Sequence, residues 1–452
     1  MKIVLIGAGS AQFGLGMLGD IFQSEALYES EIVLVDINAD AVAAVQRQAD
    51  RFLAEHPLPF TVRSTTDRAE ALPEADAVVI AIEVGDRFAL WSEDWTLPQQ
   101  WGIQQIYGEN GGPGGLFHAL RITPVILEIC EDIAKVAPEA WVFNFSNPMT
   151  AITTAVKRAY PELRFIGLCH EVASLERYLP AILDTPFENL ELRSGGLNHF
   201  SVLLEAKYQD SGKDAYPDIL KKAPAFFEKE PGYSDLLAHY KKSGVLVQTE
   251  GATNRVSLGI ERASKSWADR TLFKCFLDTY QLLPITGDSH IGEYIQWAHQ
   301  KADHKGIKDF FELYPIMLSD EDPKIELTCE ERLVPILEGL LSDEPYEEAA
   351  VNILNDNLIA DLPASLAVEV PARICKEGIK GVELPNYPKG FLALLRNYAG
   401  VYDLTAEAIL TGKKEHVIQA LLAMPMVQIY DGLDELVELM IERQRPWLDY
   451  LH

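Results

Sequence analysis

Short apolar runs alternate with segments of helical spacing through the first two hundred residues. Runs typical of strands lie at residues 2–6, 31–35, 60–63, 75–82, 141–145 and 165–168. Segments with helical spacing lie between and after them, at residues 13–22, 39–55, 120–136 and 171–183. A strand that is apolar throughout is buried on both faces, as in a parallel sheet covered by helices. The pattern predicts an α/β fold in which residues 1–190 form a Rossmann-type doubly wound sheet.

The pattern changes near residue 190, although no flexible linker marks the change. Longer strands with turns are expected at residues 190–208, and extended chain at residues 358–370. Helices are expected at residues 216–314, 328–341, 346–354 and 405–448. The change predicts a second domain of the α+β class over residues 191–452.

Acidic residues outnumber basic ones by 68 to 39 in the 452-residue chain, which gives a net charge of −29. Such a surface repels nucleic-acid phosphates and anionic membranes, so neither is an expected partner. No apolar run approaches the about 20 residues of a membrane-spanning helix. The N-terminus lacks the features of a signal peptide, and the five cysteines are widely spaced without a CxxC motif. These features predict a cytoplasmic protein in a reducing compartment.

The first candidate site is the glycine turn after the first predicted strand. Gly7, Gly9 and Ser10 stand between a strand and a helix, where backbone N–H groups can approach a pyrophosphate. Asp36 ends the second predicted strand and can accept hydrogen bonds from a ribose, which favours NAD over NADP. The third glycine of the usual fingerprint is replaced by Gln12. The alternative is a tight turn beside a surface aspartate.

Four further clusters stand near later strand ends, where doubly wound folds place ligands. They occupy residues 108–115, 144–148, 169–172 and 195–199. Each alone has a structural explanation, such as a loop, a helix cap or a buried thiol. Together they offer the Cys169 thiolate and the His199 imidazole, which are good ligands for a borderline divalent metal. Two protein ligands leave coordination positions that a substrate diol can fill.

The chain resembles glycoside hydrolase family 4, the NAD- and divalent-metal-dependent glycosidases, along nearly its whole length. The resemblance rests on the Gly-Ala-Gly-Ser start, Gly-Pro-Gly-Gly with Ala119-Leu120-Arg121, Asn147-Pro148, the tetrad at Cys169, Asn198-His199, His290 with Glu293-Tyr294, and Val368-Glu369-Val370-Pro371. The family is an NAD-dependent exception to glycoside hydrolysis by two carboxylates. The set of motifs is specific, although no single member is.

The resemblance implies roles for individual residues. Cys169 and His199 are expected to hold Mn²⁺, His170 to act as the acid toward the leaving group, and Glu109 to be catalytic. Asn147 is expected to contact both cofactor and substrate. Asn198 and His199 are expected at the substrate.

The base that removes the C2 proton is less well defined in the sequence. Family members carry a tyrosine or aspartate on a helix before the His-x-x-Glu-Tyr motif. Here residues 268–283 offer Asp269, Asp278 and Tyr280. Asp278 is our choice, and the alternative is that it is a solvated helix acid.

The implied reaction is α-glucoside cleavage. NAD⁺ removes hydride from C3, a base takes the C2 proton, the leaving group departs from C1, water adds, and the hydride returns. The tetrad Cys-His-Glu-Val resembles the α-glucosidase version and also some α-galacturonidases, which are the first alternative. A 2-hydroxy-acid dehydrogenase of the lactate/malate type shares the N-terminal pattern, and a non-enzymatic NAD-binding regulator would need no metal site. A homodimer or homotetramer is also implied.

Overall fold

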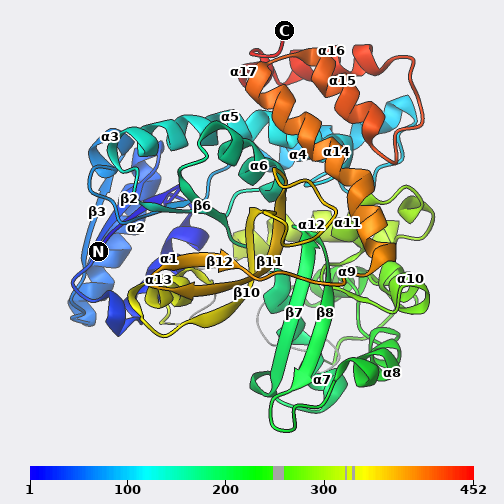
Figure 1. The fold of residues 1–452 in the computed structure, drawn as a ribbon, viewed down its shortest axis with the longest axis horizontal. Coiled ribbons are helices and arrows are strands. Elements are labelled where there is room, and N and C mark those ends of the chain that lie inside the picture. The colour runs from blue at the N-terminus through cyan, green and yellow to red at the C-terminus, as the bar shows by residue number, and fades with distance from the viewer. Residues whose placement is uncertain (170, 248–258, 321–322, 328–330) are drawn as a thin grey trace.

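The computed structural model describes residues 1–169, 171–247, 259–320, 323–327 and 331–452. Within them, twelve strands form one sheet in the order β3-β2-β1-β4-β5-β6-β10-β11-β7-β8-β9, with β12 beside β11. The strands are β1 (Lys2–Ile6), β2 (Glu31–Val35), β3 (Thr61–Thr65), β4 (Ala77–Ile80), β5 (Trp141–Asn144), β6 (Arg164–Gly167), β7 (Leu190–Leu197), β8 (Phe200–Tyr208), β9 (Leu283–Pro284), β10 (Tyr346–Leu354), β11 (Ala367–Cys375) and β12 (Gly378–Gly381). Figure 1 shows the sheet running through the molecule between layers of helices.

The α-helices of the described chain come from both halves of the sequence. They are α1 (Ala11–Phe22), α2 (Ala39–Glu55), α3 (Arg68–Ala71), α4 (Arg87–Thr96), α5 (Gly112–Val136), α6 (Met149–Ala159), α7 (Leu179–Leu183), α8 (Tyr216–Phe227), α9 (Tyr233–Ser243), α10 (Thr271–Thr279), α11 (Asp288–Ile291), α12 (His304–Asp320), α13 (Leu333–Leu341), α14 (Lys389–Thr411), α15 (Lys414–Ala423), α16 (Leu433–Arg443) and α17 (Arg445–Leu448). None of these described helices is both long and apolar enough to cross a bilayer.

The first six strands are parallel and form the predicted doubly wound sheet. β1 lies between β2 and β4, and its residues Ile3 to Leu5 are fully buried. One face of this half packs against α1, α2 and α13, and the other against α3, α5 and α6. The order 3-2-1-4-5-6 is that of the dinucleotide-binding Rossmann fold, which places a ligand crevice where β1 and β4 diverge. The predicted Rossmann-type fold is confirmed.

Residues 346–354, predicted to be helical, form strand β10 instead. β10 pairs antiparallel with β11 and continues the parallel half through the pair Asn352 and Gly167. The run Glu-Glu-Ala-Ala favours a helix locally, but the buried Glu348 carboxylate accepts hydrogen bonds from Arg332 at 2.8 and 3.0 Å. The helical prediction is wrong because long-range pairing outweighs local preference here.

The antiparallel strands join both predicted domains into one sheet. The β7–β8 hairpin, expected as longer strands with a turn, lies beside β11 and leads to β9. Strands from either side of residue 190 are therefore neighbours in the sheet. The division into 1–190 and 191–452 stays a prediction.

The C-terminal helices confirm the helical prediction for residues 405–448 and pack over α5 and α6 (Figure 1). A buried polar network fastens them. Arg121 on α5 donates to Asp94 on α4 at 2.8 Å and to Gln444, between α16 and α17, at 2.6 Å. The Gln444 amide in turn donates to Asp94 at 2.7 Å, so both charges of the buried ion pair also have a neutral hydrogen-bond partner.

Candidate active site

The glycine turn after β1 has the geometry of a nucleotide cradle. Gly7 has φ +93°, and a Cβ there would lie 2.0 Å from the Ala81 carbonyl oxygen. The Gly9 N–H donates to Asp36 Oδ2 at 2.8 Å, and a Cβ on Gly9 would lie 2.6 Å from that carboxylate. Ser10 is the exposed N-cap of α1, and the first turn of that helix carries no acidic residue. The turn thus brings backbone N–H groups and a helix N-terminus together, which fits a pyrophosphate.

Gly14 is a functional position that the sequence analysis missed. A Cβ on Gly14 would lie 2.4 Å from the Ala8 carbonyl oxygen. Close packing of the first helix on the first strand is the role of the third glycine in the fingerprint. Gly14, two positions beyond Gln12, performs it here, and a glycine within the first turns of α1 was the available signal.

Replacing Gly9 by alanine is expected to weaken NAD binding about tenfold or more, or ~1.4 kcal/mol, because Asp36 must move away from the new methyl group. Fluorescence titration with NAD measures the effect. Gly16→Ala is the matched control, because Gly16 lies in the helix that follows the turn and nothing lies within 4 Å of a Cβ there. Equal NAD affinity in Gly9→Ala and the parent would contradict the cradle.

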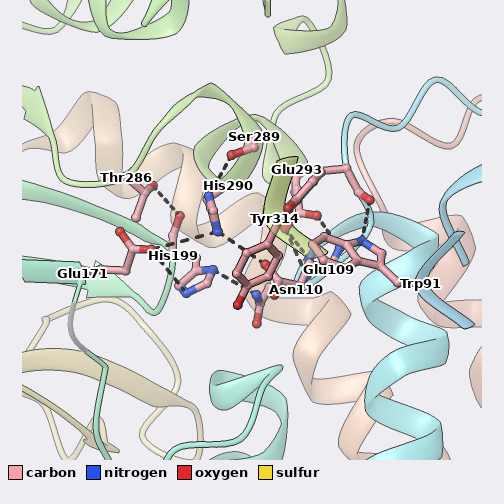
Figure 2. A network of polar contacts seen from close by, with 12 residues as sticks. Trp91, Glu109, Asn110, Glu171, His199, Thr286, Ser289, His290, Glu293 and Tyr314 are labelled. Carbon is pink, nitrogen blue, oxygen red and sulfur yellow. Dashed lines mark hydrogen bonds and ion pairs between the residues drawn. The ribbon is translucent and has the colours of Figure 1, made fainter. Parts of the chain in front are cut away.

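Three side chains from distant segments converge on one point (Figure 2). The ligand atoms of Glu109, His199 and His290 all lie within 4.8 Å of one another. Glu109 lies in the glycine loop before α5, His199 in the turn between β7 and β8, and His290 in α11. A carboxylate and two imidazoles are a suitable donor set for a divalent metal such as Mn²⁺.

The charges of this cluster are tightly coupled. His290 Nε2 lies 3.3 Å from Glu109 Oε2. Burial lowers the pKa of His290, but the hydrogen bond to Glu109 and the charge of Glu171 outweigh it and raise that pKa to about 9. Burial raises the pKa of Glu109, yet His290 and Arg87 hold it well below its usual range. Glu109 is therefore a carboxylate at neutral pH, as a metal ligand must be.

His199 sits in a conformation that its surroundings impose. Its φ is +60°, and Thr286 Oγ1 donates to its carbonyl oxygen at 3.1 Å. The Asn110 amide lies against its ring, with Nδ2 2.9 Å from Nδ1. Among the described residues, Asn110 Oδ1 has no hydrogen-bond partner. A metal on Nε2 requires a proton on Nδ1, and rotation of this amide supplies the acceptor.

The buried Glu369 carboxylate holds the turn that carries His199. Its carboxylate accepts hydrogen bonds from Asn198 Nδ2 and Ser201 Oγ, both at 2.9 Å. Asn352 on β10 donates to the same carboxylate at 3.2 Å. Strand β10, formed by residues 346–354, thus helps to position the turn that carries His199.

Cys169 follows β6 beside the same turn. Burial is the main cause that raises the pKa of its thiol, followed by the charges of Glu171 and Glu369, while the Asn198 side chain opposes the shift. Its sulfur is not among the three ligand atoms within 4.8 Å. The structure thus brings Cys169 to Asn198, the residue before His199, while the tighter donor set is Glu109, His199 and His290. His290 entered the sequence analysis only as part of a motif.

Of the remaining predicted site residues, one has a polar atom available to a ligand, one lies outside the described chain, and one is at the surface. Asn147 lies at the carboxyl end of β5, and its buried Oδ1 has no hydrogen-bond partner in the described chain, which fits a ligand hydroxyl. His170 lies outside the described residues. The Asp278 side chain is 60% exposed and pairs with Lys274 at 2.5 Å. The structure does not bring Asp278 to the cluster, because it occupies the polar outer face of α10.

The other two candidates for the C2 base are engaged in packing. Asp269 is buried and accepts the Tyr233 N–H at 2.6 Å. The Tyr280 ring stacks on Phe276 with centroids 4.9 Å apart. Among the described residues, the Asp269 carboxylate is not part of the group of three ligand atoms.

A small pocket adjoins Glu109 and is lined also by Glu83, Arg87, Trp91, Asp94, His118 and Arg121. Arg87 lies 3.3 Å from Glu109 and 3.7 Å from Glu83, with its guanidinium over the Tyr314 ring. His118 donates to the Glu109 carbonyl oxygen at 2.9 Å, and its Nε2 lies 3.3 Å from Glu83. Because Glu83 follows β4 at the nucleotide crevice, these contacts connect the crevice with the cluster.

The chain is similar to known proteins along nearly its whole length. An α-glucosidase of Erwinia rhapontici is 58% identical over 450 residues, covering 100% of this chain and 99% of that one. An α-galacturonidase of Bacillus subtilis is 27% identical over 453 residues, covering 95% and 94%. A 6-phospho-α-glucosidase from gut microorganisms, solved in complex with NAD and Mn²⁺, shares the fold with a TM-score of 0.76, 18% identity and 98% coverage of both chains.

Two family models match nearly the whole sequence. The model described as family 4 glycosyl hydrolase matches residues 2–185, and that of the family 4 glycosyl hydrolase C-terminal domain matches residues 194–427. The resemblance inferred from the motifs is confirmed, and the chain belongs to glycosyl hydrolase family 4.

Proposed function

We propose that this chain is an NAD- and divalent-metal-dependent α-glucosidase. The observation that carries the proposal is the Glu109, His199 and His290 cluster, connected through His118 and Glu83 to the nucleotide crevice. The 58% identity with an α-glucosidase over the full length supports the choice of glycone. That identity also argues against a 2-hydroxy-acid dehydrogenase.

The chain's own residues supply binding, orientation and charge. Bound NAD⁺ and metal would supply a hydride acceptor for C3 and a Lewis acid that makes the C2 proton more acidic. Gly7, Gly9 and Ser10 would hold the pyrophosphate and Asp36 the ribose. Ile37 follows Asp36 and is 97% exposed, so it offers an apolar surface for the adenine ring of NAD.

The second group of residues would act at the sugar. Glu109, His199 and His290 would hold the metal, with Cys169 beside them. Asn147 Oδ1 would accept a hydrogen bond from a sugar hydroxyl, and Asn198 would contact the substrate. His170 remains the proposed acid toward the leaving group. We further propose that the protein is a cytoplasmic homodimer or homotetramer. In this proposal, residues 1–190 bind the nucleotide, and residues 191–452 bind the substrate and form the contacts between subunits.

The charge around Arg87 favours a neutral glycone over a uronic acid. A galacturonide carboxylate would be drawn to this guanidinium, but Glu83 and Glu109 already pair with it. Adding a third carboxylate to this group would place like charges together at a substantial cost.

We therefore expect kcat/KM for p-nitrophenyl α-glucoside to exceed that for the α-galacturonide by about 10²-fold or more, or ~3 kcal/mol. The assay contains NAD⁺, Mn²⁺ and a reductant. Cleavage of the galacturonide alone would replace the proposal with the α-galacturonidase alternative. Accumulation of NADH in proportion to substrate would instead indicate a dehydrogenase.

A further inference from the structure

The glycine loop before α5 is held by one carboxylate from a distant segment. Glu293 lies in the turn Gly292–Tyr294 and is buried. Its two oxygens accept the N–H groups of Glu109, Asn110 and Gly111 at 2.6, 3.1 and 3.0 Å. Three successive N–H groups that converge on one carboxyl group hold the backbone around it in a concave shape. The loop is therefore built around Glu293 (Figure 2).

Glu293 and His290 contact the same residue from one helical turn. They are three residues apart, so both side chains point to one side. His290 Nε2 meets the Glu109 carboxylate at 3.3 Å, and Glu293 Oε1 accepts the Glu109 N–H at 2.6 Å. The position of Glu109 is thus fixed at both its backbone and its side chain.

The glycines of the loop permit this close approach. A Cβ on Gly111 would lie 2.7 Å from the Glu293 Cβ, and one on Gly115 would lie 2.3 Å from the Asn110 carbonyl carbon. The Gly112 N–H donates to the Tyr398 hydroxyl at 2.7 Å, and the Tyr402 hydroxyl donates to the Asn110 carbonyl oxygen at 3.3 Å. The glycine-rich segment is a packed structure whose backbone is hydrogen-bonded to the Glu293 turn and to α14.

We propose that Glu293 is a positioning residue that acts through Glu109 and Asn110. It holds Glu109 against His290 and Asn110 against His199, and so presets the geometry of the metal-binding cluster. Its own carboxylate takes no part in the chemistry. This inference rests on the proposed function, because it assigns to that cluster the divalent metal.

Glu293→Gln tests the proposal, since the new NH₂ group faces backbone N–H groups that need an acceptor. We expect Mn²⁺ to bind about 10- to 100-fold more weakly by calorimetry, as for other residues that orient metal ligands. The NAD affinity and the number of Mn²⁺ sites per folded chain are expected to be unchanged. Glu312→Gln is the control, because that residue makes an exposed ion pair with Lys241. Unchanged Mn²⁺ affinity in Glu293→Gln would overturn the proposal.

A double-mutant cycle separates positioning from general support of the fold. If Glu293 acts through Glu109, the loss of Mn²⁺ affinity from Glu293→Gln largely disappears in a Glu109→Gln background. Additive losses would overturn the proposal. Tyr402→Phe removes a different contact of the same loop and keeps the test available if Glu293→Gln does not fold; it should weaken Mn²⁺ binding in the same sense. Failure of the parent protein to bind Mn²⁺ would refute the proposed function itself.

Discussion

Replacing His199 by alanine is expected to abolish Mn²⁺ binding and to lower glycosidase turnover by about 10³-fold or more. The imidazole lies at the centre of the cluster, with its ring 4.5 Å from that of His290 and its Nε2 3.9 Å from Glu171. Its loss leaves Glu109 and His290, which pair with each other rather than with a metal. Metal ions contribute several kcal/mol of transition-state stabilisation, and each 1.4 kcal/mol is about tenfold in rate.

Two measurements distinguish this effect from misfolding. NAD titration should give the parent affinity, because Gly7, Gly9 and Asp36 directly follow strands β1 and β2, far along the sheet from the β7–β8 turn. His56→Ala is the matched control, since His56 is exposed at the end of α2 and packs only against Phe52 among the described aromatic rings. Parent-like Mn²⁺ affinity in His199→Ala would remove His199 from the metal site. Cys169→Ser, measured alongside, decides whether the thiolate also belongs to the metal site.

The sequence predicts best where burial leaves a simple pattern. Strand β4 is apolar throughout, and β1 and β2 are apolar after their first residue, so their parallel arrangement could be predicted from the sequence. Residues 346–354 show the opposite case. Their acidic and alanine residues favour a helix, and only the open side of β6 and the distant Arg332 make them a strand.

Some residues of the candidate site could likewise be predicted from the sequence, and others could not. Gly7, Gly9 and Asp36 directly follow two predicted neighbouring strands. Their convergence at one edge of the sheet could therefore be predicted. Glu109, His199 and His290 are about ninety residues apart, and spacing carries no information on their contact. The roles of Glu293 and Glu369 were hidden for another reason. Each acts through backbone N–H groups or amides of other residues, which leave no pattern in a sequence.

Removing all bound nicotinamide nucleotide is expected to abolish glycoside cleavage, and catalytic amounts of NAD⁺ are expected to restore it. The reaction has no net redox change, so the nucleotide is regenerated in each turnover. A hydrolase that displaces the leaving group directly at C1 needs no such cofactor. The measurement is the release of p-nitrophenol by stripped protein before and after NAD⁺ is added at a small fraction of the substrate concentration. The stripped protein retains its Mn²⁺, so the two measurements differ only in the nucleotide.

The same reaction carried out in D₂O identifies the bond that is broken. Direct displacement at C1 leaves the C2–H bond intact throughout, whereas elimination must remove that proton before the leaving group departs. The proton is later returned by a base that exchanges with solvent, so we expect the released glucose to carry deuterium at C2, measured by NMR. Substrate deuterated at C2 should react more slowly if this step limits turnover. Because the label reports bond cleavage rather than rate, it remains informative when another step is slow. Full activity of stripped protein, together with glucose that is unlabelled at C2, would exclude the redox-elimination route for this chain.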